Sequence, residues 1–368
     1  IIYLFLLFKY KILKLMASNY NIYFNSRIFK TFDLKNENIY SSYNKIINNC
    51  VKYNTSQITI YKNDEQLLDI RNKTHPLRIE TMSVTKSICA LSVLFLIQDG
   101  LISNIDDKLS LYFNDWKNDN KQNITIKEVL SMTAQLENKW NYDEFMFPDG
   151  DYKKDKPPRN EIKRPNVNKI ARKMSFSNHK LVGDFEYNNI CSQIIPSLVL
   201  EITGIQIDKY LEKRLFNPLN IKIEWNKDDN GNPYGPNGIS IKSDDLCKIG
   251  LMILNKGEYL GNKIIKSQLI DIYLENYVVN MESLKTSFEI QNIKEYVSID
   301  GYGLSNWKMS SPKSENISMF MGYMGQCLII DFDNKIVASK LNWCDYEADD
   351  FNKNERKIYN EFIDEYII

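Results

Sequence analysis

The chain has 368 residues, 43% of them hydrophobic, and its 47 basic side chains balance its 47 acidic ones. This length is enough for a large core and suggests about two domains or lobes. The balanced charge argues against a nucleic-acid partner, because binding to phosphates requires an excess of basic groups or a basic face.

The N-terminal segment is apolar, but its uninterrupted apolar run ends at Phe8. A membrane-spanning helix needs ~20 such residues, and lysines follow the run instead of preceding it as they do in a secretory signal. Because the first methionine is Met16, we interpret residues 1–20 as a non-native extension or a flexible N-terminus. We expect one domain at 21–368, a cytoplasmic location and no membrane partner; an N-terminal anchor is the alternative.

Metal chemistry is not expected from the cysteines or the histidines. The six cysteines are scattered, with no Cys-x-x-Cys pair, so the spacing of zinc ligands is absent. The two histidines, His75 and His179, are far apart in the sequence and form no His-x-x-x-His pair. We therefore predict no metal and no cofactor, and the scattered thiols favour a reducing compartment.

The first patterned segments predict a hairpin and a buried helix. Two short β-rich runs, 57–61 and 66–70, flank the polar turn 62–65, which is typical of a β-hairpin. An almost wholly apolar segment then runs from Ser83 to Gly100. It predicts a helix that is buried on nearly all faces and ends at the glycine.

The middle of the chain, about residues 100–240, predicts a mostly helical lobe. A Thr-Ile-Lys-Glu capping box at 125–128 is expected to begin a short helix. The charged, proline-containing insertion at 137–178 predicts a long loop with one weak helix at 168–174, and such loops are usually functional rims or disordered. Residues 189–204 predict a further helix with a glycine at its end.

The last third of the chain predicts a helix and a second hairpin. Ser-Asp-Asp at 243–245 is expected to cap a helix that runs to 257, with both aspartates at the positive end of its dipole. Residues 326–332 and 335–341 predict two strands, and a polar helix is expected from about 354. Strands at both chain ends with helices between them predict an α/β fold of the α+β type. Its antiparallel sheet is built from both ends of the chain and flanked by helices, with a helical insertion lobe.

Ser83 and Lys86 are the first candidates for catalysis. Three residues apart on a helix, they share one face and their side chains can approach each other. A serine hydroxyl is a poor nucleophile unless a neighbour takes its proton, and a lysine that burial has made neutral can do so. Backbone amides at a helix N-terminus also favour developing negative charge. The alternative is a helix cap beside a solvated lysine.

Four segments in order resemble one family. Ser-x-x-Lys at the start of a buried helix is similar to the first motif of the serine β-lactamases and penicillin-binding proteins. Tyr-Asn-Asn at 187–189 resembles the Tyr-x-Asn motif of the class C-like branch. The segment 215–221 resembles its Leu-Phe-x-Pro-Leu-Gly segment, and the stretch 238–250 resembles its Gly-Leu…Asp-Leu-x-x-x-Gly pattern. The resemblance extends from about residue 57 to 343.

The resemblance implies roles for individual residues. Ser83 would attack an acyl carbon, Lys86 would take or share its proton, and Tyr187 would be a general acid/base near the leaving group. Asn189 would form a hydrogen bond with Lys86 or with the substrate. The backbone N–H of Ser83 would be one donor of the oxyanion hole.

The third family motif departs from the usual pattern. Phe320 stands where the family usually has the cation of Lys-Thr-Gly or His-x-Gly. The Gly-x-x-Gly-Gln form that follows resembles the esterase and 6-aminohexanoate-dimer-hydrolase relatives, and the backbone near Tyr323 is expected to supply the second oxyanion donor. The missing cation argues against recognition of a β-lactam carboxylate more than against acyl transfer. The candidates for substrate binding are Asn189, Gly322, Tyr323, Gly325 and Gln326.

We therefore predict a serine hydrolase that acts through an acyl-serine intermediate on an ester, amide or peptide-like bond. Its partner would be a small-molecule or peptide-like substrate, and little or no β-lactamase activity is expected. A catalytically silent binding protein with the same fold is the alternative, and a cell-wall D,D-peptidase would require an exported chain. Four aromatic residues of the insertion either line a substrate cleft or pack within their own loop: Trp140, Tyr142, Phe145 and Phe147.

Overall fold

The computed structural model describes residues 19–24, 27–28, 46–52, 54–139, 164–177, 183–275, 277 and 298–343. The helix expected from about 354 lies outside these residues. So do His179 and the four aromatic residues of the insertion at 140–147.

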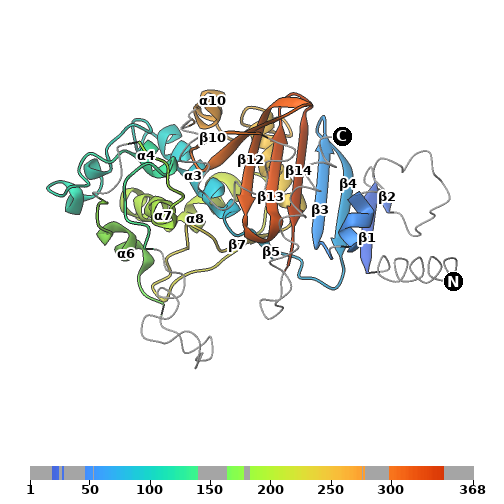
Figure 1. The fold of residues 1–368 in the computed structure, drawn as a ribbon, viewed down its shortest axis with the longest axis horizontal. Helices are drawn as coiled ribbons and strands as arrows, with labels where there is room; N and C mark the ends of the chain where they lie inside the picture. Colours follow the sequence, from blue (N-terminus) through green and yellow to red (C-terminus); the bar gives the residue numbers. More distant parts are fainter. Residues whose placement is uncertain are drawn as a thin grey trace.

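A nine-stranded antiparallel sheet forms the centre of the molecule, in the order β10-β11-β12-β13-β14-β3-β4-β1-β2 (Figure 1). The last strand pairs with the first hairpin, with Ala338 opposite Ile60. This pairing confirms that the sheet is built from both ends of the chain, and both predicted hairpins are present. The strands are β1 (Tyr20–Phe24), β2 (Arg27–Ile28), β3 (Gln57–Lys62), β4 (Glu65–Asn72), β10 (Ser298–Gly303), β11 (Asn306–Ser311), β12 (Ser314–Gly322), β13 (Gln326–Asp331) and β14 (Ile336–Leu341).

Two parts of the sheet were not predicted from the sequence. Strand β1 begins at Tyr20, the last residue of the segment that was expected to lie outside the domain. The hydroxyl of Tyr20 donates to the carbonyl of Cys50, so this residue is part of the folded structure. Strands β10 and β11 extend the sheet at the other end, where they pair with each other and with β12.

Two smaller sheets accompany the large one. The first has three strands in the order β5-β7-β6, with β5 at Ile79–Glu80, β6 at Glu224–Trp225 and β7 at Ile239–Ile241. The second is a hairpin of β8 (Glu258–Tyr259) and β9 (Asn262–Lys263). The first small sheet is the one that positions the candidate site.

Five predicted helices are present to within a few residues of their expected bounds, and the helical segments at 46–52, 207–216 and 267–275 were not predicted. The helices are α3 (Val84–Gln98), α4 (Ile126–Leu130), α6 (Val167–Lys173), α7 (Asn189–Thr203), α8 (Ile207–Leu211), α9 (Ser243–Leu254) and α10 (Ser267–Glu275), with a π-helical turn at Glu212–Phe216 and a further helical segment at 46–52. The capping box of α4 is complete, since Thr125 and Glu128 each accept from the other's backbone N–H. Helix α7 ends at Gly204, whose φ of 69° is the left-handed conformation that glycine adopts without strain.

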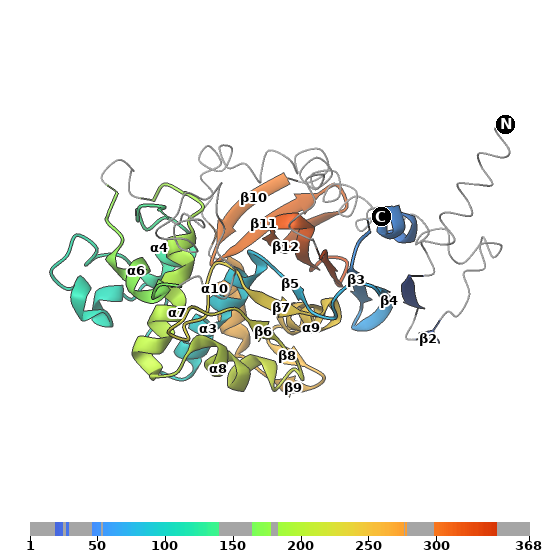
Figure 2. The same ribbon diagram turned by 90° about the horizontal axis from the view of Figure 1, so that it is seen from below.

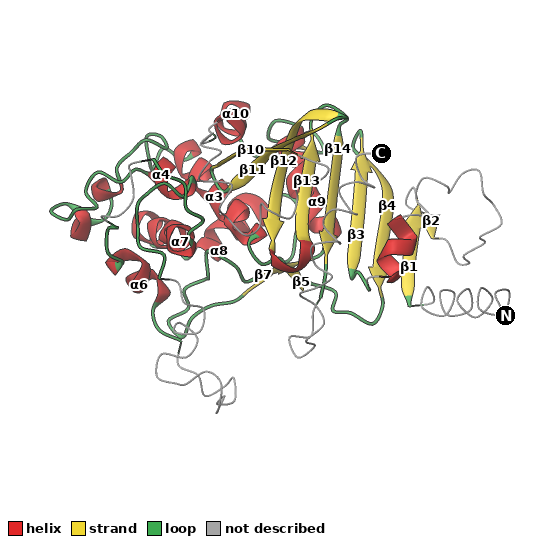
Figure 3. Ribbon diagram, viewed as in Figure 1, coloured by secondary structure: helices red, strands yellow, loops and turns green. Residues whose placement is uncertain are grey.

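The helices divide into a layer on the sheet and a lobe beside it. One row of side chains crosses one face of the sheet from Phe320 through Leu328 and Ser339 to Thr59, because these residues are register partners. Helices α3, α9 and α10 lie on this face, while α4, α6, α7 and α8 form the lobe beyond β10 and β12 (Figures 2 and 3). Helix α3 joins the two parts and is buried from Val84 to Leu96, as its apolar sequence predicts.

All five described cysteines are free and buried. Within the described residues, no single helix is long and apolar enough to cross a membrane. The bent pair of α7 and 207–216 meets the criterion only by its combined length and composition.

Candidate active site

Ser83 lies between the short strand β5 and the first turn of α3. Thr81, at the end of β5, holds this junction through its N–H, 2.8 Å from the carbonyl of Ile239, and its hydroxyl, 3.0 Å from the same carbonyl. Met82 then has a φ of 50°, in the left-handed region that costs a non-glycine residue about 1–3 kcal/mol. This turn places Ser83 at the N-cap of α3 with its side chain partly exposed.

Lys86 lies behind Ser83 and is only 2% exposed. Its Nζ is 2.8 Å from the Oγ of Ser83 and 2.9 Å from the carbonyl oxygen of Pro236. The approach of the two side chains that the three-residue spacing predicts is therefore present. The arrangement places a partly exposed serine in contact with a buried amine.

Tyr187 is the third predicted catalytic residue, and the structure brings it to the same place. Lys86 Nζ is 4.9 Å from the centroid of the Tyr187 ring. The indole of Trp307 stacks on this ring, with centroids 6.1 Å apart and planes 17° apart. Tyr302 contacts both rings, edge to face, so the position of Tyr187 is determined by β10 and β11 as well as by its own loop.

Asn188 and Asn189 differ in burial and in their hydrogen bonds. Asn188 is buried and caps α7, because its Oδ1 accepts from the N–H of Ile190 at 2.8 Å while its Nδ2 donates to the carbonyl of Leu136 at 2.8 Å. Asn189 is partly exposed at the first position of the helix. Among the described residues, no hydrogen bond joins Asn189 to Lys86. Of the two roles expected for Asn189, the bond to Lys86 is not observed and the contact with substrate stays a prediction. The carbonyl of Pro236 is a partner of Lys86 that sequence reasoning missed.

Gly322 brings the end of β12 against the start of α3. A Cβ on Gly322 would lie 2.3 Å from the carbonyl oxygen of Thr81 and 3.0 Å from the backbone nitrogen of Ser83. No larger residue fits without moving one of the two segments. The Ser83 N–H donates no hydrogen bond to any residue that the structure describes.

A tight turn, Tyr323–Gly325, joins β12 to β13 beside Ser83. Met324 and Gly325 both have a positive φ, of 66° and 76°. Tyr323 is 44% exposed and stands at the rim of the site. The turn therefore presents the Tyr323 side chain to solvent, and its backbone directly follows Gly322.

Gln326 holds this turn with its side chain. It is fully buried, with its Nε2 2.6 Å from the carbonyl of Asn342 and its Oε1 2.8 Å from the N–H of the same residue. Asn342 in turn donates to the carbonyl of Met324 at 2.9 Å. Both ends of its amide therefore bond the backbone of Asn342, just after β14, and a contact of Gln326 with substrate stays a prediction.

Phe320 lies two residues before Gly322 on the same face of β12. It is fully buried and packs edge to face on Tyr273, with ring centroids 6.3 Å apart. The position where the family usually has a cation is therefore occupied by an apolar side chain inside the core.

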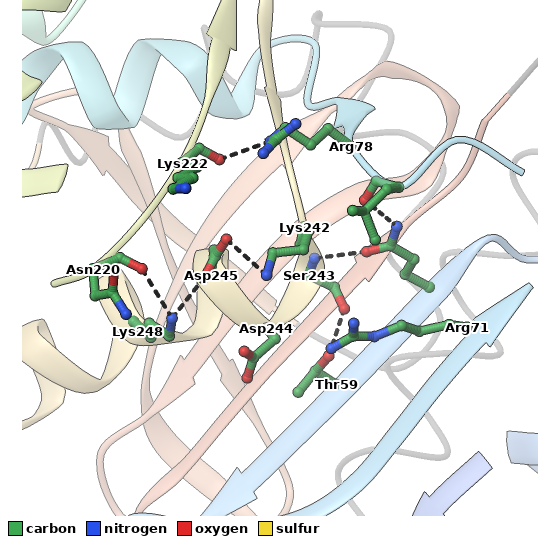
Figure 4. A network of polar contacts seen from close by, with 12 residues as sticks. Thr59, Arg71, Arg78, Asn220, Lys222, Lys242, Ser243, Asp244, Asp245 and Lys248 are labelled. Atoms are coloured by element: carbon green, nitrogen blue, oxygen red, sulfur yellow. Dashed lines mark hydrogen bonds and ion pairs between the residues drawn. The ribbon is translucent and has the colours of Figure 1, made fainter. Parts of the chain in front are cut away.

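The residues Ser243, Asp244 and Asp245 begin α9, and both aspartates lie in its first turn as predicted, but none of the three is its N-cap (Figure 4). The N-cap is Lys242, without a side-chain cap bond. Ser243 Oγ lies 2.5 Å from Thr59 Oγ1, and Asp244 accepts from the hydroxyl of Tyr61 at 2.7 Å. Burial and then this carboxylate raise the pKa of Tyr61 well above its usual range, so the phenol stays protonated.

Asp245 bonds Lys248 on the next turn of α9, with 2.6 Å between the charged groups. These contacts explain the three side chains without any catalytic role.

Other features of the described residues lie outside this site. A cavity of about 990 Å³ opens at the far end of the sheet, lined by Tyr61, Gln66, Asn255 and Tyr259 among others. Burial raises the pKa of the Cys89 thiol, one turn from Lys86, so this thiol stays protonated. No cluster of three or more His, Cys, Asp or Glu residues suitable for a metal is present among the residues that the structure describes.

Comparison with known protein families returned a match. The family model described as Beta-lactamase matches residues 59–260, which is more than half of the chain. A comparison with curated proteins returned no match.

Several solved structures share the fold. A Bacillus anthracis protein assigned as a 6-aminohexanoate-dimer hydrolase has a TM-score of 0.62 and 16% identity, over 84% of this chain and 80% of its own. EstCE1, a hydrolase with promiscuous acyltransferase activity, has a TM-score of 0.61 and 13% identity, over 83% and 93% of the two chains. A penicillin-binding protein homologue from Caulobacter crescentus has a TM-score of 0.58 and 10% identity, over 84% and 92%.

At these identities the structural likeness establishes the fold, and the family model establishes the relationship. The matched range includes the Ser-x-x-Lys pair at the start of the buried helix and the Tyr-x-Asn segment. The chain belongs to the Beta-lactamase family.

Proposed function

We propose that the protein is a serine hydrolase that cleaves an ester, amide or peptide-like bond through an acyl-enzyme at Ser83. The observation that carries this proposal is the 2.8 Å contact between Lys86 Nζ and Ser83 Oγ. A nucleophile must reach both solvent and a base, and Ser83 is partly exposed whereas Lys86 is buried behind it.

The chemistry follows from the positions of the donors and acceptors. In its amine form Lys86 has two N–H groups and one lone pair, and an N–H donated to the carbonyl of Pro236 leaves the lone pair for the hydroxyl of Ser83. As the Ser83 oxygen bonds to the acyl carbon, its proton passes to Lys86. The carbonyl oxygen of the substrate becomes an oxyanion that the N–H of Ser83 and the backbone at Tyr323 would stabilise.

The next step releases the leaving group and completes acylation of Ser83. The oxyanion collapses, the bond to the alcohol or amine breaks, and Lys86 or Tyr187 returns the proton to the departing atom. Water then attacks the acyl-enzyme with the same groups in reverse order, which releases the acid and regenerates the hydroxyl of Ser83.

A neutral substrate fits the site better than a carboxylate-bearing β-lactam. Phe320 occupies the position of the usual cation and lies in the core against Tyr273. The exposed side chain at the rim is the aromatic Tyr323. The structural likeness to EstCE1 and to the 6-aminohexanoate-dimer hydrolase supports esters and amides as the first compounds to screen.

Intact-protein mass spectrometry after incubation with a fluorophosphonate probe tests the proposal. We expect one adduct on the wild type, none on Ser83→Ala, and labelling roughly 10²- to 10⁴-fold slower on Lys86→Met, which keeps the side-chain stem but loses the base. Ser92→Ala is the matched control, because Ser92 is a buried serine of the same helix whose hydroxyl bonds only the carbonyl of Cys89 among the described contacts. This variant should label like the wild type.

A folded wild type that takes up no probe and turns over no activated ester would contradict the proposal. The catalytically silent binding protein would then be the better description. The apolar Phe320 at the family's cation position is the observation that favours this second candidate.

A further inference from the structure

Gln193 of α7 is a fully buried amide that bonds the loop carrying Pro236. Its Oε1 accepts from the N–H of Gly235 at 2.8 Å, and its Nε2 donates to the carbonyl of Pro233 at 3.1 Å. The side chain therefore holds the backbone on the N-terminal side of Pro236 at two points. The Pro236 carbonyl is the acceptor that lies 2.9 Å from Lys86 Nζ.

The packing of Gly235 against α7 reinforces these bonds. A Cβ on Gly235 would lie 2.2 Å from the carbonyl oxygen of Ser192 and 3.0 Å from the Cδ of Pro196. Pro196 has no N–H with which to bond the carbonyl of Ser192 four residues earlier, so that carbonyl is left for the loop to approach. Gln193, Pro196 and Gly235 thus form one contact between helix and loop.

The C-terminal side of the loop is held just as firmly. The carbonyl of Ile239 accepts from Thr81, and the N–H of Ile239 donates to the hydroxyl of Thr85 at 3.3 Å. Pro236 consequently lies between two fixed points: the contacts of Gly235 and Pro233 with α7, and the bonds of Ile239 to Thr81 and Thr85 beside Ser83. Its carbonyl has little freedom to leave Lys86.

A buried polar network fixes Gln193 itself. Its Nε2 also donates to Asn168 at 2.8 Å, Asn168 donates to Asn232 at 3.1 Å, and Asn232 donates to the carboxylate of Asp228 at 2.8 Å. Each of these residues is at most 6% exposed. Since a half-satisfied buried network is costly, the amide of Gln193 has a single orientation.

We propose that Gln193 is a positioning residue for Lys86, which it acts on through the carbonyl of Pro236. The inference rests on the proposed function of Lys86 as the base for Ser83. An N–H of the Lys86 amine bonded to the Pro236 carbonyl fixes the rotation of the amine about its Cε–Nζ bond. In this rotation the lone pair can point at the hydroxyl of Ser83. Without Gln193 the amine keeps its place in the core but loses this orientation, so proton transfer slows while substrate binding is unchanged.

The test compares Gln193→Leu with Val199→Ala. Leucine fills a similar volume but can neither accept from Gly235 nor donate to Pro233. Val199 is fully buried on the same helix, so its truncation also lowers the melting temperature and serves as a matched control for destabilisation. The maximal rate of fluorophosphonate labelling should fall roughly 10- to 100-fold in Gln193→Leu, with an unchanged half-saturating probe concentration. Val199→Ala should keep the wild-type rate.

A second readout does not depend on activity. In protein with isotopically labelled lysine, the ε-carbon resonance of Lys86, assigned by its loss in Lys86→Met, should shift in Gln193→Leu and stay in place in Val199→Ala. An unshifted resonance or an unchanged labelling rate in Gln193→Leu would overturn the positioning role. An unlabelled wild type would instead count against the proposed function, and the resonance would still decide whether Gln193 positions Lys86.

Discussion

The candidate nucleophile and base depend on two backbone features next to them. Met82 holds a left-handed conformation between β5, which is paired with β7, and the start of α3. Gly322 then allows β12 to approach Ser83 more closely than any residue with a Cβ could. Local strain and a close approach together expose Ser83 while Lys86 stays buried.

At this scale we predict the effect of Gly322→Ala. The added methyl group must push Thr81 or Ser83 away, and a misplacement of ~1 Å at a reacting group can cost roughly 10²-fold in rate. The labelling rate at Ser83 should fall by that order. Gly322 has an extended φ of −137°, so an alanine there meets only the steric clash. Gly261→Ala is the control for an added methyl group without a clash, because a Cβ there meets no atom within 4 Å and only its φ of 78° is strained. Equal labelling rates in the two variants would contradict the prediction.

The elements that carry the site are held by close packing of helices on one sheet face. Gly250 of α9 lies directly over the sheet, and a Cβ at this position would be 2.6 Å from Cγ1 of Val337 and 3.1 Å from Cδ1 of Leu328. At the start of the helix, Ser243 bonds Thr59 on β3. The glycine and the polar anchor together set the distance between α9 and the sheet.

Gly250→Ala tests this packing. In an open helix the change would stabilise by roughly 0.5–1 kcal/mol, but overpacking against a stiff valine costs about 1–3 kcal/mol, so the free energy of unfolding should decrease. Urea denaturation of Gly250→Ala, Val337→Ala and the double variant measures the effect. The double variant should lose less than the sum of the two single losses, and simple additivity would show that the methyl group finds room elsewhere.

At the scale of the whole molecule, one polar cluster joins the segment before β3 to the segment after β14. Ser56, before β3, lies 2.8 Å from Nδ1 of His75 and accepts from the N–H of Trp343, after β14, at 2.6 Å. The His75 ring also contacts the indole of Trp343, with centroids 5.3 Å apart. Partial burial lowers the pKa of His75 below its usual 6.5. The cluster therefore favours a neutral imidazole.

This cluster predicts a pH dependence of stability. Since the pKa of His75 is lower in the folded than in the unfolded chain, the unfolded state binds more protons and stability falls as the pH decreases below about 6.5. The free energy of unfolding by urea, measured between about pH 7 and pH 5, should decrease toward acid in the wild type. His75→Gln should reduce this slope, and an unchanged slope would assign it to other groups.

Elements with a local pattern were predicted well because their determinants lie within a few residues of each other. The hairpin of β3 and β4, the apolar helix α3 and the capping box of α4 follow from alternation, an apolar run and a reciprocal cap. Strands β10 and β11 were missed, since β10 includes two glycines and the two become strands by pairing, β10 with β11 and β11 with β12. Their pairing is a tertiary event.

The pair of Ser83 and Lys86 belongs to what the sequence determined by itself, because a helix brings residues three apart onto one face. Only the tertiary structure decided their surroundings. Pro236, 150 residues from Lys86 in the chain, reaches its Nζ only after α7 and β7 have fixed the loop between them. The same folding turned Gln326 inward to bond Asn342 and placed Trp307 on Tyr187. The spacing of residues along a helix follows from the backbone geometry of the helix itself. A partner 150 residues away reaches Lys86 only when the elements between them have packed together.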